Sequence, residues 1–236
     1  MSSGREKLYF WDDKSMRWYI NAIEYGSFHS VVAEKMMRTL DASARIVDVG
    51  CGVGALIRHL APRCVHVTGI DLNPKPLVYI KSLGYKNVDV INGDFDALTA
   101  PETKYDAAVF CLAGGVNNYI DKAFSWADKL FFIENATNLR SFSSVGERSK
   151  EMYYNEDIDL LQKRGEKFRY EFFSAPFGQV FVDREDAENF MRHYDKAETE
   201  EDIRRFLDER LTPINHEKYT LYMDNIKPLI LIQVEK

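Results

Sequence analysis

Apolar residues recur along this chain with two periods, and each period predicts a different element. Over residues 12–40 the apolar and aromatic positions lie three and four apart, which predicts helix, and Gly26 with Ser27 predicts a break between two helices. Short apolar runs then alternate with helical segments. The predicted order is strand 44–49, helix 54–60, strand 65–70, helix 75–83, strand 88–92, strand 105–112, helix 118–127 and strand 129–133. Strands that alternate with helices favour a parallel, doubly wound sheet.

Beyond the last of these strands the alternation loosens, and a polar stretch over 138–150 precedes a predicted helix at 156–163. Aromatic and charged residues alternate over 168–172, and turn residues at 175–178 lead into a further apolar run, so this segment predicts a β-hairpin. The remainder predicts two charged helices, 184–193 and 199–210, and two strands, 218–223 and 229–234. We expect these last two strands to pair antiparallel and to close the edge of the sheet.

The pattern as a whole predicts one α/β domain over residues 1–236. Its sheet is expected to be doubly wound and mostly parallel, with about seven strands and a reversed C-terminal strand. The expected parts are an N-terminal helical lid (1–43), a ligand-binding core (44–135), an insert or cap with helices after the fifth strand (136–215) and a terminal strand pair (216–236).

The most informative motif is the run DVGCGVG at residues 48–54, which places Gly50, Gly52 and Gly54 where a predicted strand becomes a helix. Glycine lets the backbone turn sharply and approach a ligand closely, because no Cβ intervenes. The free amides at the start of the helix favour a carboxylate or a phosphate.

Carboxylates follow the next two predicted strands. Asp71, in GIDLN, stands at a strand end where it could accept both hydroxyls of a ribose. Asp94, in NGDF, could accept a hydrogen bond from the amino group of an adenine, while Phe95 or Leu72 stacks on the base.

The ordered series DVGCGVG, GIDLN, NGDF and YDAAVFCLAGG resembles the motifs of the class I S-adenosylmethionine-dependent methyltransferases, over about residues 44–135. The resemblance implies that the three glycines line the methionine part of S-adenosylmethionine, with Asp48 near its amino group. It also implies that the backbone at the end of the fourth strand lies beneath the sulfonium. The cofactor-binding residues expected in this way are Asp48, Gly50, Cys51, Gly52, Gly54, Asp71, Leu72, Asp94, Phe95, Cys111 and Leu112.

The same glycines also fit the dinucleotide pattern GxGxxA, with Asp71 about 20 residues further on, and this alternative would make the protein an NAD-dependent dehydrogenase. Asp48 argues against it, because its carboxylate would repel a pyrophosphate but attract an ammonium group. The Gly93–Asp94 pair and the reversed terminal strand also favour the methyltransferase interpretation.

Composition and charge limit the classes of partner that we expect for this chain. The net charge is −6 and the three cysteines, Cys51, Cys64 and Cys111, lack metal-ligand spacing. An acidic chain lacks the positive field that neutralises a phosphate backbone, so nucleic acid is a disfavoured partner. Free thiols, and the lack of a signal-like or membrane-spanning apolar stretch, predict a cytoplasmic protein without a bound metal.

The acceptor and any catalytic base are not identified by a motif. His29, Tyr119 and His193 are the candidates for a base, although a lone histidine is more often structural. The aromatic residues between Trp11 and Phe28 could form a lid over the cofactor, and those between Phe168 and Phe181 could wall an acceptor, or both groups could simply form core. We expect transfer of a methyl group to an O, N, C or S atom of a small molecule. The alternatives are a nucleic-acid or protein methyltransferase and a non-catalytic cofactor-binding module.

Overall fold

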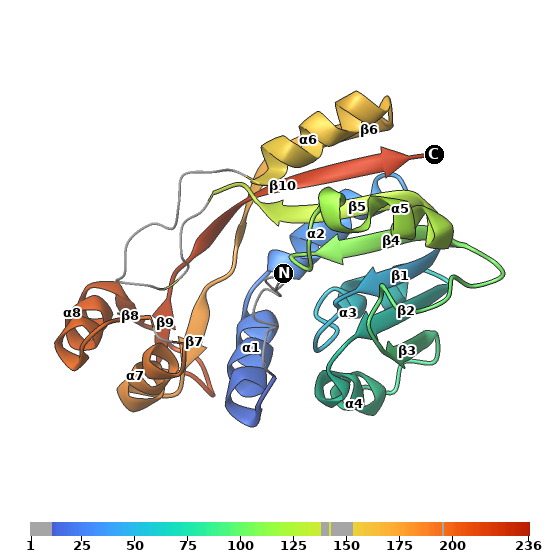
Figure 1. The fold of residues 1–236 in the computed structure, drawn as a ribbon. Helices are drawn as coiled ribbons and strands as arrows, with labels where there is room; N and C mark the ends of the chain where they lie inside the picture. Colours follow the sequence, from blue (N-terminus) through green and yellow to red (C-terminus); the bar gives the residue numbers. More distant parts are fainter. Residues whose placement is uncertain (1–10, 138–141, 143–152, 195) are drawn as a thin grey trace.

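The computed structural model describes residues 11–137, 142, 153–194 and 196–236. It contains a large twisted sheet with helices on both faces and a smaller group of elements beside it (Figure 1). All but one residue of the predicted polar stretch lie outside the described residues. No helix in the described ranges has the length and apolar character needed to cross a membrane.

The large sheet has seven strands in the order β3-β2-β1-β4-β5-β10-β6. Its strands are β1 Arg45–Val49, β2 His66–Asp71, β3 Val88–Asn92, β4 Tyr105–Cys111, β5 Ala127–Asn135, β6 Lys167–Pro176 and β10 Ile226–Glu235. Strand β10 runs antiparallel to both of its neighbours, and the other pairs are parallel. The predicted mostly parallel sheet with a reversed C-terminal strand is therefore confirmed.

Helices cover both faces of this sheet and bury two apolar cores. One face packs on α2 (Phe28–Met37), α3 (Ile57–Leu60) and α4 (Pro74–Ser82), and the other packs on α5 (Val116–Trp126) and α6 (Tyr153–Arg164). A 3₁₀ turn, η1 (Ala61–Arg63), continues α3. The carboxyl ends of the parallel strands meet at one edge of the sheet, where a doubly wound fold binds its ligands.

The smaller group of elements forms a cap with its own core. It consists of α1 Asp13–Tyr25, β7 Gln179–Phe181, α7 Arg184–His193, α8 Glu200–Arg210, β8 Leu211–Pro213 and β9 Leu221–Met223, with β7-β9-β8 as a three-stranded sheet. Helix α1 is fixed to it by Trp18, which is buried in the cap core and donates from Nε1 to Asp186 at 2.9 Å. Of the helices predicted to form an N-terminal lid, α1 packs with this group, whereas α2 packs on the large sheet.

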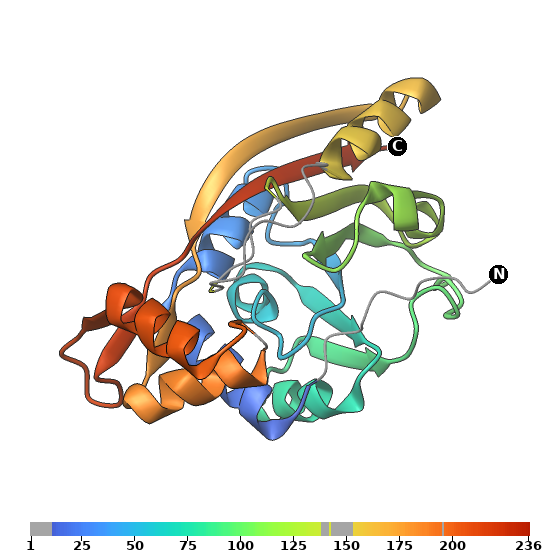
Figure 2. The same cartoon turned by 60° about the vertical axis from the view of Figure 1, so that its left-hand side comes forward.

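Two predicted strand pairings were wrong. Strand β6 pairs with β10 along its whole length instead of forming a hairpin with β7 (Figure 2). Strand β9 pairs with β7 and β8 instead of β10, and β10 lies inside the sheet, so β6 forms the edge. The cap elements from β7 to β9 accordingly lie between β6 and β10, rather than directly after the fifth strand. Alternating apolar residues identify a strand but do not choose its partner.

Candidate active site

The glycine loop leaves β1 at the carboxyl edge of the sheet. The amides of Gly50 and Cys51 both donate to the carbonyl of Ile70, at 2.8 and 3.0 Å, which fixes the loop against the end of β2. Gly50, Gly52 and Gly54 all have left-handed φ angles, of 72°, 52° and 73°. Residues with a Cβ disfavour this conformation, so the loop depends on its glycines.

Gly52 packs against an aromatic ring. A Cβ on Gly52 would lie 2.7 Å from the indole ring of Trp11, so the ring covers the loop only because this side chain is missing. Trp11 is buried and makes an edge-on contact with Tyr19 of α1, with ring centroids 5.2 Å apart. The segment that leads into α1 therefore closes one side of the loop.

Asp71 connects the end of β2 to the glycine loop. One carboxylate oxygen accepts from the amide of Gly52 and the other from the amide of Asn73, both at 2.8 Å. Burial raises the pKa of Asp71, while these two hydrogen bonds act in the opposite direction. Each oxygen can accept a further hydrogen bond, which is what two neighbouring hydroxyls would need.

Asp48 lies beneath the loop on β1, with only 2 % of its surface exposed. No hydrogen bond or ion pair within the described residues involves its side chain. Burial, and then the charge of Asp71, raise the pKa of Asp48 to about 8. A buried carboxylate without a partner is costly when charged, so this position favours the approach of a cation.

Around β3 the structure separates the residues that were expected to hold an adenine. Asp94 is exposed, and Leu72 is 45 % exposed at the end of β2. Phe95 is only 5 % exposed and packs against the rings of Phe110, Tyr119 and Trp126. The expectation that Phe95 stacks on the base needs correction, because its ring is already enclosed by core aromatics. Leu72 is the side chain that remains accessible.

The turn after β4 lies close to the glycine loop. Leu112 has a left-handed φ of 56°, and its amide donates to Ile133 at 2.9 Å. A Cβ on Gly50 would lie 2.5 Å from the Cβ of Ala113, so the two turns pack directly together. A non-glycine residue in this conformation is strained, and such strain is concentrated at functional sites.

Two acidic residues that the sequence analysis missed fix the start of α5. The carboxylate of Asp157, on α6, accepts from the amides of Val116 and Asn117 at 3.0 and 2.7 Å. Glu134, at the end of β5, lies beside it, and burial together with the charge of Asp157 raises the pKa of Glu134. A Cβ on Gly115 would collide with the Asp157 carboxylate, so only glycine fits there. The turn from β4 to α5 is thus held by acidic groups.

The three candidate bases have separate environments. His29 is buried, its Nε2 lies 3.3 Å from the hydroxyl of Tyr19, and burial, followed by the charges of His59, Lys227 and Arg58, lowers its pKa to about 3. Tyr119 stacks on Phe110. His193 faces Asp12 at 3.6 Å, beside the start of α1. A general base needs a pKa near the working pH, and the lowered pKa of His29 does not meet this requirement.

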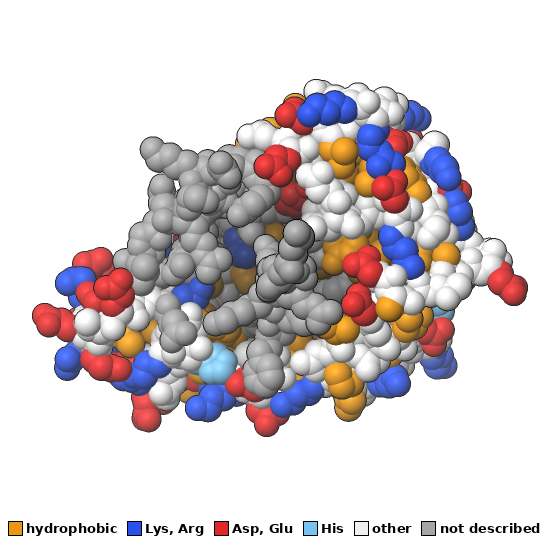
Figure 3. All heavy atoms as spheres, in the orientation of Figure 1, with side chains coloured by type: hydrophobic (Ala, Val, Ile, Leu, Met, Phe, Trp, Pro, Cys, Tyr) orange, Lys and Arg blue, Asp and Glu red, His pale blue; other side chains and the backbone are white. Residues whose placement is uncertain are grey.

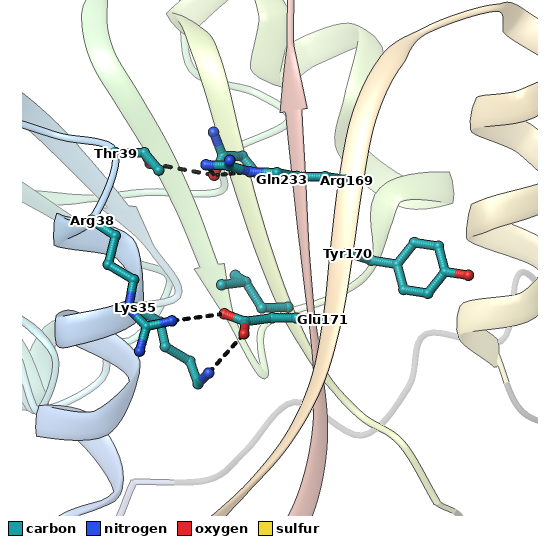
Figure 4. A pocket seen from close by; sticks show the side chains of 8 residues that line it. Lys35, Arg38, Thr39, Arg169, Tyr170, Glu171 and Gln233 are labelled. Carbon is teal, nitrogen blue, oxygen red and sulfur yellow. Dashed lines mark hydrogen bonds and ion pairs between the residues drawn. The ribbon is translucent and has the colours of Figure 1, made fainter.

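A separate hollow of about 340 Å³ lies between α2, β6 and β10 (Figure 4). Its charged side chains already bind one another: Lys35 pairs with Glu171 at 2.9 Å, and Arg169 donates to Gln233 at 2.8 Å. On the face in Figure 3, acidic and basic side chains are interspersed over the described surface. The charged side chains of this hollow have partners, whereas Asp48 has none among the described residues. The candidate site is therefore placed at the carboxyl ends of the strands and not in the hollow.

The comparisons with known proteins agree with this geometry. Residues 46–128 match the family described as a methyltransferase domain. The chain is 39 % identical over 75 residues to the ubiquinone biosynthesis O-methyltransferase of Dechloromonas aromatica, a match that covers 26 % of this chain and 32 % of that protein. The chain thus spans about a third of the length of that curated relative.

Solved structures share the fold over a longer part of the chain. The YcgJ protein of Bacillus subtilis is 11 % identical with a TM-score of 0.54, and the match covers 88 % of this chain and 97 % of that one. The precorrin-6y C5,15-methyltransferase of Geobacter metallireducens is 12 % identical with a TM-score of 0.51, and the match covers 88 % of each chain. The match of residues 46–128 to a methyltransferase domain and the sheet order, with the reversed β10 between β5 and β6, support a class I S-adenosylmethionine-dependent methyltransferase.

Proposed function

We propose that the protein transfers a methyl group from S-adenosylmethionine to a small-molecule acceptor. The observation that carries this proposal is the pair of carboxylates on either side of the glycine loop. The unpartnered carboxylate of Asp48 suits the ammonium of the methionine part, and Asp71 suits the ribose hydroxyls. Asp94 and Leu72 are exposed next to them and suit the adenine.

For this reaction the protein mainly has to align the accepting atom with the methyl group of the cofactor. The cofactor supplies an electrophilic methyl group, and a nucleophilic O, N, C or S atom of the acceptor displaces the sulfur in line. The turn at Leu112, which packs against the glycine loop at the end of β4, is where this proposal places the acceptor. The Trp11 ring, which covers the loop at Gly52, is expected to exclude water from that side. The curated relative's name supports an oxygen as the accepting atom.

The alternatives fit these residues less well. A dinucleotide would bring its pyrophosphate to a loop with a buried carboxylate beneath it, which costs electrostatic energy. A nucleic acid would bring phosphates towards the turn at Gly115, where Asp157 and Glu134 are both acidic. S-adenosylmethionine, which has no pyrophosphate, avoids the first conflict, and a small acceptor avoids the second.

We expect isothermal titration to give micromolar or tighter binding of S-adenosylmethionine and S-adenosylhomocysteine, and no binding of NAD, at the same protein concentration. A panel of small phenols, acids, amines and thiols would then be screened for formation of S-adenosylhomocysteine. Binding of NAD alone would overturn the proposal and make the protein a dehydrogenase.

The affinity for S-adenosylhomocysteine is expected to depend on pH through Asp48. The pKa of Asp48 is about 8 in the free protein, so binding of an ammonium group requires the loss of a proton below that pH. Affinity should therefore rise by about tenfold per pH unit between about pH 6 and about pH 8, with release of about one proton. Titrations in two buffers of different ionisation enthalpy measure both quantities.

Asp48→Asn is expected to bind more weakly at about pH 8 and to lose most of the pH dependence. Asp106→Asn serves as the control, because Asp106 is exposed on β4 at the opposite edge of the sheet and accepts from the amide of Arg45. Wild-type protein whose affinity is the same across this pH range would show that Asp48 does not meet the ammonium.

A further inference from the structure

Lys227 stands at the carboxyl edge of the large sheet. The pairing of β10 with β5 ends at Leu229 and Asn135, so Lys227 extends two residues beyond the end of β5. Leu229 and Leu231 pack in the core beneath α2 and α3, and strand alternation places Lys227 on that same face. Its Nζ lies 5.1 Å from the centre of the Phe177 ring. Lys227 thus belongs to the edge that also carries the glycine loop.

The groups that face Lys227 come from several segments, and none of them is a carboxylate. They are Cys111 at the end of β4, His29 of α2, Phe177 before β7 and Lys196 after α7. Burial, and then the charge of Lys196, lower the pKa of Lys227 to about 8, while Cys111 opposes the shift. Within the described ranges, Lys227 forms no ion pair with an acidic residue. Among the described residues, its ammonium group therefore has no counter-ion.

The end of β4 consequently lies between Asp48 and Lys227, and neither side chain forms an ion pair with a described residue. The pKa of the Cys111 thiol is raised by burial and then by Asp48, and Lys227 acts on it in the opposite direction. A partly buried ammonium group is costly without a counter-ion, and an anion that enters with the ligand removes that cost. Asp48 suits the positively charged ammonium group of the cofactor. Lys227 suits a negatively charged group on another ligand.

We propose that Lys227 selects the methyl acceptor by binding an anionic oxygen of it, a carboxylate or a phenolate, between the Phe177 ring and the end of β4. This inference rests on the proposed function, and it specifies the class of acceptor. The ring of Phe177 provides an apolar surface for the body of the acceptor, and Lys227 provides the charge. Lys227 binds and orients the acceptor.

The test compares ligands that have the same shape and differ in charge. Benzoate and benzamide form one pair, and 4-nitrophenolate and 4-nitroanisole the other, each titrated at about pH 8 into protein saturated with S-adenosylhomocysteine. Wild type is expected to bind one anion at least tenfold more tightly than its neutral partner, and the pair that responds distinguishes a carboxylate from a phenolate. Lys227→Met should lose this preference, Lys227→Arg should keep it, and Lys86→Met, which removes an exposed lysine, should match wild type.

A second readout does not depend on the cofactor. In competitive labelling with acetic anhydride at about pH 8, the lowered pKa of Lys227 favours reaction of its neutral amine, and the exposed Lys86 serves as the reference. The preferred anion should protect Lys227 alone. Equal binding of charged and neutral ligands in wild type, or labelling unaffected by either anion, would overturn the role of Lys227. Failure of S-adenosylhomocysteine to bind would instead overturn the proposed function.

Discussion

Asp71→Ala is expected to weaken the binding of S-adenosylhomocysteine by at least about a hundredfold while the protein remains folded. The carboxylate would lose its hydrogen bonds to the two ribose hydroxyls, each worth about 1.5–3 kcal/mol when one partner is charged. It would also stop holding the amide of Gly52, so the loop would lose one of its fixed positions. Isothermal titration measures the affinity, and urea unfolding measures the stability.

Asp71→Asn and Asp106→Ala separate the two contributions. Asparagine keeps one acceptor oxygen, so we expect a loss of about tenfold, between wild type and alanine. Asp106 also accepts from a backbone amide, that of Arg45, but it lies at the opposite edge of the sheet. Asp106→Ala should therefore reduce the free energy of unfolding without changing the affinity. Equal affinities of Asp71→Ala and wild type would remove Asp71 from the proposed ribose site.

The central part of the fold could be predicted because its signals are local. Each strand from β1 to β5 is a short apolar run, and each is placed by the glycines, prolines or charged residues at its ends. Parallel strands joined by helices allow only a few arrangements, and the observed order β3-β2-β1-β4-β5 is one of them. The glycine loop and the carboxylates of Asp48 and Asp71 lie within 24 residues of one another, and the structure brings them together.

The C-terminal half could not be predicted in the same way, because its pairings join distant segments. The segment at 168–172 alternates as a hairpin strand would, but its partner β10 begins 50 residues beyond the end of β6. The short strand β8 was not recognised, because three residues carry no period. Contacts with β7 and β9, which are distant in sequence, define these strands.

The same limit applied to the site. Glu134 ends a predicted strand with a carboxylate, the signal that singled out Asp71, and it could have been found in that way. Asp157 and Lys227 could not, because nothing in their local sequence distinguishes them from surface charges. Only the folded chain places Asp157 at the start of α5 and Lys227 near Cys111. Phe95 or Leu72 was expected to stack on the adenine. The ring of Phe95 packs against core aromatics instead, which its local sequence does not reveal.

Gly52→Ala is expected to reduce the affinity for S-adenosylhomocysteine by about thirtyfold, or about 2 kcal/mol. The added Cβ would occupy the space of the Trp11 ring, and the φ of 52° would be strained. Relief of either conflict changes the direction of the Gly52 amide, which is bound to Asp71. The loop and the carboxylate proposed to bind the ribose would therefore move together.

Gly84→Ala is the matched control for this change. Gly84 also has a left-handed φ, of 70°, but a Cβ there would meet nothing within 4 Å. Both variants should lose about 1 kcal/mol of unfolding free energy through backbone strain, and only Gly52→Ala should lose affinity as well. Adding Trp11→Ala to Gly52→Ala removes the collision but not the strain, so we expect part of the affinity to return. If Gly52→Ala bound S-adenosylhomocysteine as tightly as Gly84→Ala, the cofactor could not depend on the shape of this loop, and the site would have to be sought elsewhere on the sheet edge.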